Sequence, residues 1–180
     1  MSRISAVDPS TATVAAKEAL DAVQARFGMV PMMARTMAQS SAVVTGWAAL
    51  SGALAEGTLG ARTGELIALA VGQANACNYC LAAHTALGER VGLTSEERLE
   101  ARRGRATDPK EAAAVRLALT ILETRGAVSD DALVLARAAG LSDAELSEVT
   151  AHVALNVLTN YFNRLADTDI DFPKVDVRLP

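Results

Sequence analysis

Apolar positions recur along most of the chain at the spacing of one face of an α-helix. Alanine, which favours helices, is abundant, whereas the alternation of β-branched and polar residues that marks strands is nearly absent. The pattern therefore predicts an all-α fold. The expected helices span residues 10–26, 31–38, 41–56, 61–74, 77–91, 95–104, 109–125, 129–138 and 143–165.

Capping signals separate these predicted helices. Thr94 with Glu97, and Ser142 with Glu145, have the spacing of a capping box, in which each side chain satisfies a free backbone N–H of the first turn. Ser129 opens another helix in the same manner. Glycines stand where helices are expected to stop, at Gly28, Gly57, Gly92, Gly126 and Gly140.

The last residues, 167–180, contain Pro173 and alternating charges. A proline cannot continue a helix, so this stretch is expected to be extended. It predicts an arm that packs either on the body of the chain or on a neighbouring subunit.

Composition narrows the class of protein. The 180 residues are 51% hydrophobic, which suffices for a buried core and predicts one domain over residues 1–180. A net charge of −4 argues against nucleic acid, and the densest basic run, residues 98–105, is mixed with Glu97 and Glu100. Neither a signal peptide nor a membrane-spanning run is recognisable, so we expect a cytoplasmic protein that acts away from membranes.

The two cysteines of the chain, Cys77 and Cys80, stand three positions apart and are followed by His84. On a helix these three side chains fall within about 60° of one another on one face. Residues 75–76 look like a break between helices, so the thiols would occupy a first turn, where free N–H groups favour the thiolate. In a reducing compartment such a pair is a redox couple or half of a metal site.

Glu65 heads the strongly apolar run 66–71. By itself it is either a solvated charge near a helix start or a carboxylate directed into a pocket. The order Glu65, Cys77, Cys80, His84, with eleven residues before the first cysteine and three after the second, resembles the core motif of the AhpD-like alkylhydroperoxidase and carboxymuconolactone decarboxylase superfamily. The resemblance extends over Pro31, Ser40 to Trp47, Arg62 to His84, and Asn156 to Pro173, with the core motif in residues 62–91.

The resemblance implies an AhpD-like helical fold, a homo-oligomer, and motif cysteines that line a cavity near subunit contacts. It further implies a thiol-dependent peroxidase in which Cys80 attacks the hydroperoxide, Cys77 resolves the sulfenic acid to a disulfide, and His84 relays the proton to Glu65. Neither a cofactor nor a metal is expected. The partners would be a hydroperoxide substrate and a reductant, either a dithiol protein or a small thiol.

Two alternatives remain open. Cys77, Cys80 and His84 could be ligands in a metal-binding protein, although a closed zinc site normally needs four. The chain could also be an oligomeric member of the superfamily that acts on a substrate other than a peroxide.

Two further features have more than one interpretation. Tyr79 stands where AhpD itself has a histidine, and it could bind substrate by hydrogen-bonding a peroxide oxygen, or cover the pocket. His152, Asn156, Asn160 and Asn163 form a polar stripe at helical period. The stripe could line the cavity or satisfy buried polar groups at a subunit contact, and we expect the structural role.

Overall fold

The computed structural model describes residues 2–179, and within them it contains α-helices and no strand. The predicted all-α fold is confirmed, and a helix lies in each predicted range. The helices are α1 Val14–Phe27, α2 Met32–Met37, α3 Ser41–Ala55, α4 Ala61–Ala74, α5 Asn78–Arg90, α6 Ser95–Arg102, α7 Pro109–Thr124, α8 Asp130–Ala138 and α9 Asp143–Ala166. None of them combines the length and the apolar character needed to cross a bilayer.

The largest error in the predicted boundaries is the start of α1, which begins at Val14 rather than at residue 10. Asp8 explains the delay, because its carboxylate accepts hydrogen bonds from the backbone N–H and the hydroxyl of Ser10 and holds a turn there. The helix then starts from Thr13, whose hydroxyl accepts from the N–H of Ala16. Both predicted capping boxes, before α6 and α9, are present.

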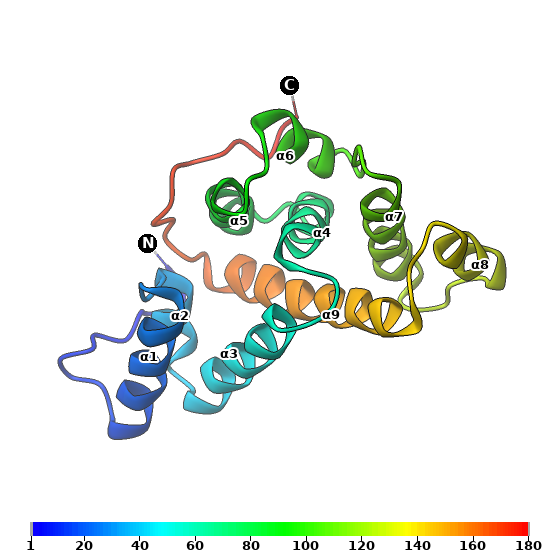
Figure 1. The fold of residues 1–180 in the computed structure, drawn as a ribbon. Coiled ribbons are helices and arrows are strands. Elements are labelled where there is room, and N and C mark those ends of the chain that lie inside the picture. Colours follow the sequence, from blue (N-terminus) through cyan, green and yellow to red (C-terminus); the bar gives the residue numbers. More distant parts are fainter. Residues whose placement is uncertain (1, 180) are drawn as a thin grey trace.

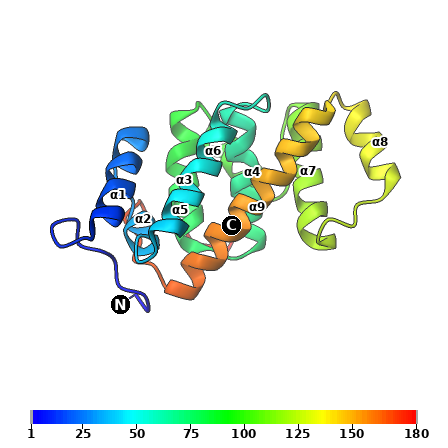
Figure 2. The ribbon, with the colours of Figure 1, turned by 90° about the horizontal axis from the view of Figure 1, so that it is seen from below.

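Helix α4 occupies the centre of the molecule, and α5, α6, α7 and α9 pack around it (Figure 1). Its central position explains why residues 66–71 are all apolar, since neighbours cover every face of this segment. Seen from below, α1 and α2 lie at one end of the molecule and α8 at the other, and α9 crosses between them (Figure 2). Arg62 ties α4 to its neighbours through ion pairs with Glu97 of α6 and Glu111 of α7.

The buried apolar side chains form two clusters. One joins α4, α7 and α9 through residues such as Ile67, Val115 and Val149. The other joins α1, α2 and α3, and it includes Cys77 and Cys80. The two sulfur atoms therefore lie in a packed apolar environment rather than on an open surface.

The arm after α9 is extended, as predicted, and it packs on the body of its own chain. From Asp167 it runs past α5 to α6 (Figure 1). The backbone carbonyl of Val177 accepts from the Gln73 amide at 2.8 Å, and that of Asp176 accepts from Arg102 at 2.6 Å. The arm thus closes over the α4–α5–α6 side of the molecule.

Helix α9 carries an exposed apolar stripe on the face opposite its polar stripe. Leu158, Tyr161 and Leu165 are 42%, 55% and 64% exposed, and they are spaced at three and four residues. Large side chains gathered on one solvent-facing stripe are typical of a surface that a partner covers. The predicted homo-oligomer therefore has a candidate contact on this face of α9 rather than on the polar stripe.

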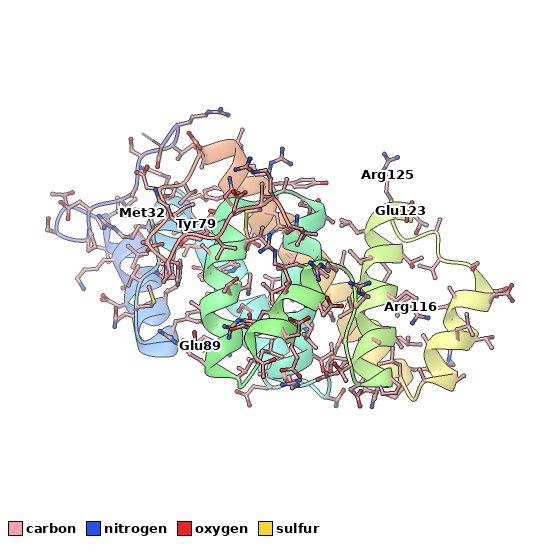
Figure 3. The ribbon with its side chains drawn as sticks, turned by 90° about the horizontal axis from the view of Figure 1, so that it is seen from above. Met32, Tyr79, Glu89, Arg116, Glu123 and Arg125 are labelled. Atoms are coloured by element: carbon pink, nitrogen blue, oxygen red, sulfur yellow. A yellow bond between two sulfur atoms is a disulfide. The ribbon has the colours of Figure 1, made fainter. Side chains whose placement is uncertain are left out.

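We predict that the protein forms at least a dimer and that Tyr161→Glu combined with Leu165→Glu weakens it, because two charges would be buried without partners. The dissociation constant should rise about tenfold or more, corresponding to ~1.4 kcal/mol. Light scattering at micromolar concentration measures this change. Arg116→Glu on the exposed face of α7 (Figure 3) is the matched charge-changing control and should leave the assembly intact. An 18.7 kDa monomer for the unmodified chain would contradict the prediction.

Candidate active site

The start of α5 positions the two cysteines. Ala76 adopts a left-handed conformation, with φ of 50°, and this residue turns the chain from α4 into α5. Cys77 is the N-cap of α5, and its sulfur accepts a hydrogen bond from the N–H of Cys80 at 3.3 Å. The predicted break at residues 75–76 and the first-turn position of the sulfur atoms are both present. The free N–H groups of this turn supply positive partial charge to the sulfurs.

Cys77 and Cys80 are joined in a disulfide, and their Cα atoms lie 5.3 Å apart. Both residues are almost completely buried, with exposed fractions of 1% and 2%. The disulfide joins residues three positions apart, so its closure and opening change the covalent structure of only one helical turn. Such a disulfide suits a redox cycle better than a structural cross-link, since it closes a short loop.

A cavity of about 270 Å³ lies beside Cys80. Its wall is mostly apolar, and it includes the aromatic rings of Phe27, Trp47 and Phe172. The polar side chains in the wall come from α3, α4, α5 and α9, and they are Ser51, Glu65, Tyr79, His84, Arg90, His152, Asn156, Thr159 and Asn163. Of the predicted site residues, Glu65, Tyr79, Cys80 and His84 line this one cavity, whereas Cys77 does not.

Glu65 and His84 form a hydrogen-bonded pair across α4 and α5. The Nδ1–H of His84 donates to Oε2 of Glu65 at 2.8 Å, and both side chains are largely buried, with 23% and 18% exposed. Burial lowers the pKa of His84, but the charge and hydrogen bond of the Glu65 carboxylate outweigh it, so the pKa lies above the ordinary 6.5. Of the two interpretations of Glu65, the carboxylate directed into a pocket is the one observed.

His84 follows Cys80 by one helical turn, at a spacing that puts neighbouring side chains on the same surface of α5. Its second ring nitrogen is not engaged by Glu65, so it can face the cavity. An imidazole held in this way by a carboxylate can both stabilise a nearby thiolate and exchange a proton with it.

Tyr79 contributes its ring to the cavity wall, while its hydroxyl is occupied elsewhere. The hydroxyl accepts from the backbone N–H of Met33 at 3.2 Å and donates to Asp171 of the arm at 2.9 Å. Asp171 also accepts from the N–H of Met32, so one carboxylate fastens α2 and α5 to the arm. Burial is the main cause that raises the pKa of Tyr79, so the hydroxyl keeps its proton. The geometry fits Tyr79 as a covering residue, because its one donor hydrogen is already committed.

The polar stripe of α9 faces inward, and three of its four residues line the cavity, which is the first of the two interpretations given above. The Asn163 amide donates to the sulfur of Cys80 at 3.5 Å and to that of Met33 at 3.1 Å. Asn160 does have a structural contact, since its amide oxygen accepts from Asn75 beside the α4–α5 turn. The polar side chains of α9 therefore form a second polar part of the cavity wall, and Asn163 of this part contacts Cys80.

His152, another member of the stripe, lies against α4 at Gly64. A Cβ atom on Gly64 would come within 2.9 Å of the His152 ring, so only glycine leaves room for the ring there. Burial lowers the pKa of His152, the charges of Glu148 and Glu65 raise it, His84 lowers it, and the net shift is downward. The lowered pKa of His152 favours its neutral imidazole, whereas the raised pKa of His84 favours the protonated ring.

The described residues contain no group of three His, Cys, Asp or Glu side chains arranged to hold a metal ion. The ligand set of the metal-binding alternative is therefore not assembled in this part of the chain. Of these two proposed ligands, His84 borders the cavity and Cys77 does not.

Three residues at this site were not identified as site residues from sequence. Asn163 was recognised only as part of the stripe, and its contact with Cys80 depends on how α9 crosses α5. Asp171 lies in the extended arm and is 139 residues from Met32, so no local pattern marks it. Gly64, one position before Glu65, carried a usable signal, because a glycine inside an apolar helix often marks a close approach.

A sequence model of the carboxymuconolactone decarboxylase family matches residues 41–124. This range contains α3 to α7 and every predicted motif residue. No functionally curated protein matches the chain.

Solved structures match nearly the whole chain. An AhpD-core, uncharacterised peroxidase-related protein from Ralstonia eutropha JMP134 is 22% identical with a TM-score of 0.82, and the match covers 94% of this chain and 92% of that one. A peroxidase-related protein from Silicibacter sp. TM1040, also uncharacterised, is 18% identical with a TM-score of 0.77, covering 97% and 96%. A debrominase in complex with 2,3,4-tribromopyrrole is 15% identical with a TM-score of 0.76, covering 93% and 91%. At these identities the similarity establishes a common fold.

The raised pKa of His84 makes a pH-dependent contribution to stability. Because the folded state binds the proton more tightly than the unfolded state, the stabilisation is fully present below pH 6.5 and is lost as the pH rises through the folded-state pKa. We predict that Glu65→Gln leaves burial unopposed and moves the pKa of His84 below 6.5. NMR titration of the His84 ring measures the pKa, and denaturant unfolding at acidic and alkaline pH measures the stability.

The matched control for this test is Glu123→Gln on the exposed part of α7, which should leave the His84 titration unchanged. The loss of stability in Glu65→Gln should be larger at acidic than at alkaline pH. An unchanged His84 titration in Glu65→Gln would show that the carboxylate is not its partner.

Tyr79→Phe removes the hydroxyl that joins Met33 and Asp171. We expect it to lower the free energy of unfolding by about 1–3 kcal/mol, because a buried N–H and a carboxylate each lose a partner. Urea unfolding measures the loss. The matched control is Tyr161→Phe at the exposed tyrosine of α9, which should change stability by less than about 0.5 kcal/mol. Equal effects of the two substitutions would contradict the role assigned to the buried hydroxyl.

Proposed function

We propose that the chain, which has the AhpD-like fold and matches the carboxymuconolactone decarboxylase family over residues 41–124, is a thiol-dependent peroxidase that reduces organic hydroperoxides. In this proposal Cys80 is the attacking thiolate, Cys77 the resolving thiol, and His84 with Glu65 the proton relay. Electrons come from a dithiol protein or a small thiol, so the reaction needs neither a metal nor a cofactor.

One observation carries the proposal. The sulfur of Cys80 borders the same apolar cavity as the His84–Glu65 pair, and a second sulfur is within bonding distance behind it. A peroxidase of this kind needs a nucleophile, a proton acceptor beside it and a resolving thiol. These three groups meet here on α4 and α5.

The proposed reaction balances in three steps. The Cys80 thiolate attacks the terminal oxygen of the hydroperoxide, the O–O bond breaks, and the departing alkoxide takes a proton from His84 to give an alcohol and a sulfenic acid. The thiol of Cys77 then attacks the Cys80 sulfur and releases water, giving the disulfide seen in the structure. An external dithiol finally reduces the disulfide and is itself oxidised.

The cavity favours a substrate with an organic body. Phe27 and Trp47 stack at 5.3 Å between ring centroids, and Phe172 meets Tyr79 edge-on at 5.8 Å. These rings offer an apolar surface that an alkyl or aryl group can bury and that hydrogen peroxide cannot use. We therefore expect organic hydroperoxides to react faster than hydrogen peroxide.

The same aromatic lining favours a second candidate, reductive dehalogenation of a brominated ring. A structural neighbour is a debrominase in complex with a tribromopyrrole. Replacing bromine by hydrogen consumes two electrons, which the oxidation of Cys77 and Cys80 to a disulfide supplies. A peroxide and a bromopyrrole should therefore be compared as substrates of the same reduced protein.

We predict that the reduced protein consumes cumene hydroperoxide and loses both thiols together, in an intramolecular Cys77–Cys80 disulfide. Cys80→Ser should abolish the reaction, and Glu65→Gln should slow it by about a hundredfold, the scale of a lost proton relay. Stopped-flow measurement of peroxide consumption, with mass spectrometry of alkylated thiols, tests both. Glu123→Gln, outside the site, should react at the parent rate.

The possible results of this experiment distinguish the peroxidase from the dehalogenase. Oxidation by 2,3,4-tribromopyrrole but not by hydroperoxide would favour the dehalogenase. Persistence of two free thiols in the presence of both substrates would refute both redox functions. If Glu65→Gln and His84→Gln both consume peroxide at the parent rate, these two residues do not relay the proton.

A further inference from the structure

A second pocket lies on the far side of the disulfide from the apolar cavity. Its volume is about 260 Å³, close to that of the cavity, but its wall is more polar. It is lined by Ala76, Cys77, Asn78, Tyr79, Asn163, Arg164, Asp167, Thr168 and Ile170. Cys77 borders this pocket and not the cavity, whereas Cys80 borders the cavity and not this pocket.

The two spaces share one wall. Tyr79 and Asn163 line both of them, and with the disulfide they form the partition. A molecule in one space therefore meets one sulfur, and a molecule in the other space meets the second sulfur.

This division matters because thiol–disulfide exchange is directional. The attacking thiolate, the sulfur it attacks and the departing sulfur must lie nearly in line, and the rate depends on which sulfur is accessible. A thiolate arriving from the second pocket meets Cys77, with Cys80 behind it as the leaving group. A thiolate arriving through the cavity would meet Cys80 and would compete with the substrate.

We propose that the second pocket is the binding site of the reductant, a small dithiol or a dithiol-bearing segment, and that it delivers electrons to Cys77. This inference rests on the proposed function, since it assigns the reductive step of the same disulfide. Substrate and reductant would then approach from opposite sides of one wall.

Two of the residues that line the second pocket carry a buried polar atom with no hydrogen-bond partner in the described part of the chain. Thr168 is 93% buried, and its hydroxyl forms no hydrogen bond within the described residues. The amide oxygen of Asn163, which is 3% exposed, is also unpaired. Buried polar atoms normally have partners, so these two suit a ligand with hydrogen-bond donors near its thiols, such as hydroxyl or amide N–H groups.

The charges around the pocket suit a thiolate nucleophile. The first residues of α5, Asn78 and Tyr79, line the pocket, and so does Arg164, which donates to the carbonyl of Asn75 at 2.8 Å. Both features lower the energy of a negative charge near Cys77. The carboxylate of Asp167, which also lines the pocket, has the opposite effect, and it disfavours ligands that carry additional negative charge.

The proposed step balances. One thiolate of the dithiol attacks the Cys77 sulfur, the bond between Cys77 and Cys80 breaks, and its electron pair leaves with Cys80 as a thiolate. The Asn163 amide, which donates to the Cys80 sulfur at 3.5 Å, supports that charge. The second thiol of the reductant then attacks the mixed disulfide, releases Cys77 as a thiol, and closes the reductant to a disulfide. The protein gains two electrons and the one proton of the second thiol, and Cys80 remains as a thiolate.

The test uses two matched substitutions. Asn78 and Ala61 are both exposed first residues of their helices, and they line the second pocket and the cavity respectively. Asn78→Trp should slow reduction of the oxidised protein by dithiothreitol at least tenfold, whereas Ala61→Trp should slow the reaction of the reduced protein with cumene hydroperoxide. Ala74→Trp, at an exposed position in neither wall, controls for the added ring. Quenched alkylation and mass spectrometry follow the thiols, and circular dichroism verifies that each variant is folded.

A second measurement identifies the sulfur without any substrate. In Cys80→Ser the single thiol of Cys77 should be alkylated by iodoacetamide through the second pocket, and adding Asn78→Trp should slow that alkylation at least tenfold. Adding Ala61→Trp instead should not slow it. This experiment remains informative if an Asn78 variant proves poor in one assay, because it uses a different reagent and a different oxidation state.

The outcomes separate this proposal from the proposed function. Reduction of the disulfide and alkylation of Cys77 are measured without peroxide, so they test the pocket even if no peroxide is consumed. Slowing by Ala61→Trp but not by Asn78→Trp in the reductive assay would place the reductant in the cavity and overturn the proposal. Equal rates in all variants would overturn it as well.

Discussion

The turn between α4 and α5 is the constraint on which the site depends. Ala76 holds a left-handed conformation that costs a non-glycine residue about 1–2 kcal/mol. In return, α5 runs back beside α4, Cys77 caps its first turn, and Glu65 on one helix meets His84 on the other at 2.8 Å. If the chain continued straight, the carboxylate and the imidazole would be separated along one long helix. The strained backbone at Ala76 thus makes possible the preorganised pair of Glu65 and His84.

The surrounding elements keep that turn rigid. Helix α4 is buried among α5, α6, α7 and α9, and this packing fixes the side of the site on which the Glu65 carboxylate lies. The arm closes the other side, because Asp171 binds both the Tyr79 hydroxyl and the N–H of Met32. The backbone that carries the cysteines is therefore held from both sides. Segments far apart in the chain supply this rigidity.

The disulfide divides the site into two unlike environments. On one side the wall is apolar and aromatic, with one charged pair beside Cys80. On the other side it is polar, with unpaired hydrogen-bonding groups around Cys77. Such asymmetry lets two neighbouring sulfur atoms have different nucleophilicity and different access, and these are the properties that assign their separate roles. A pair of cysteines in a uniform environment would lack this distinction.

Local patterns in the sequence were sufficient for the helices, the break at residues 75–76, the caps at Thr94 and Ser142, and the order of Glu65, Cys77, Cys80 and His84. These features depend on interactions within a few residues, so spacing alone reveals them. Even the contact between Glu65 and His84 could be anticipated, through the family resemblance. The start of α1 was misplaced because a single side chain, Asp8, competes with the helix for backbone N–H groups.

Only the tertiary structure decided what faces the sulfurs. The crossing of α9 over α5 puts Asn163 against Cys80, and the path of the arm commits the Tyr79 hydroxyl to Asp171. The separation of Cys77 from the cavity also depends on packing, since both cysteines share one helical face in the sequence pattern. Contacts between residues 80 or more positions apart leave no periodic signal, because they depend on how whole helices pack rather than on which residues form them.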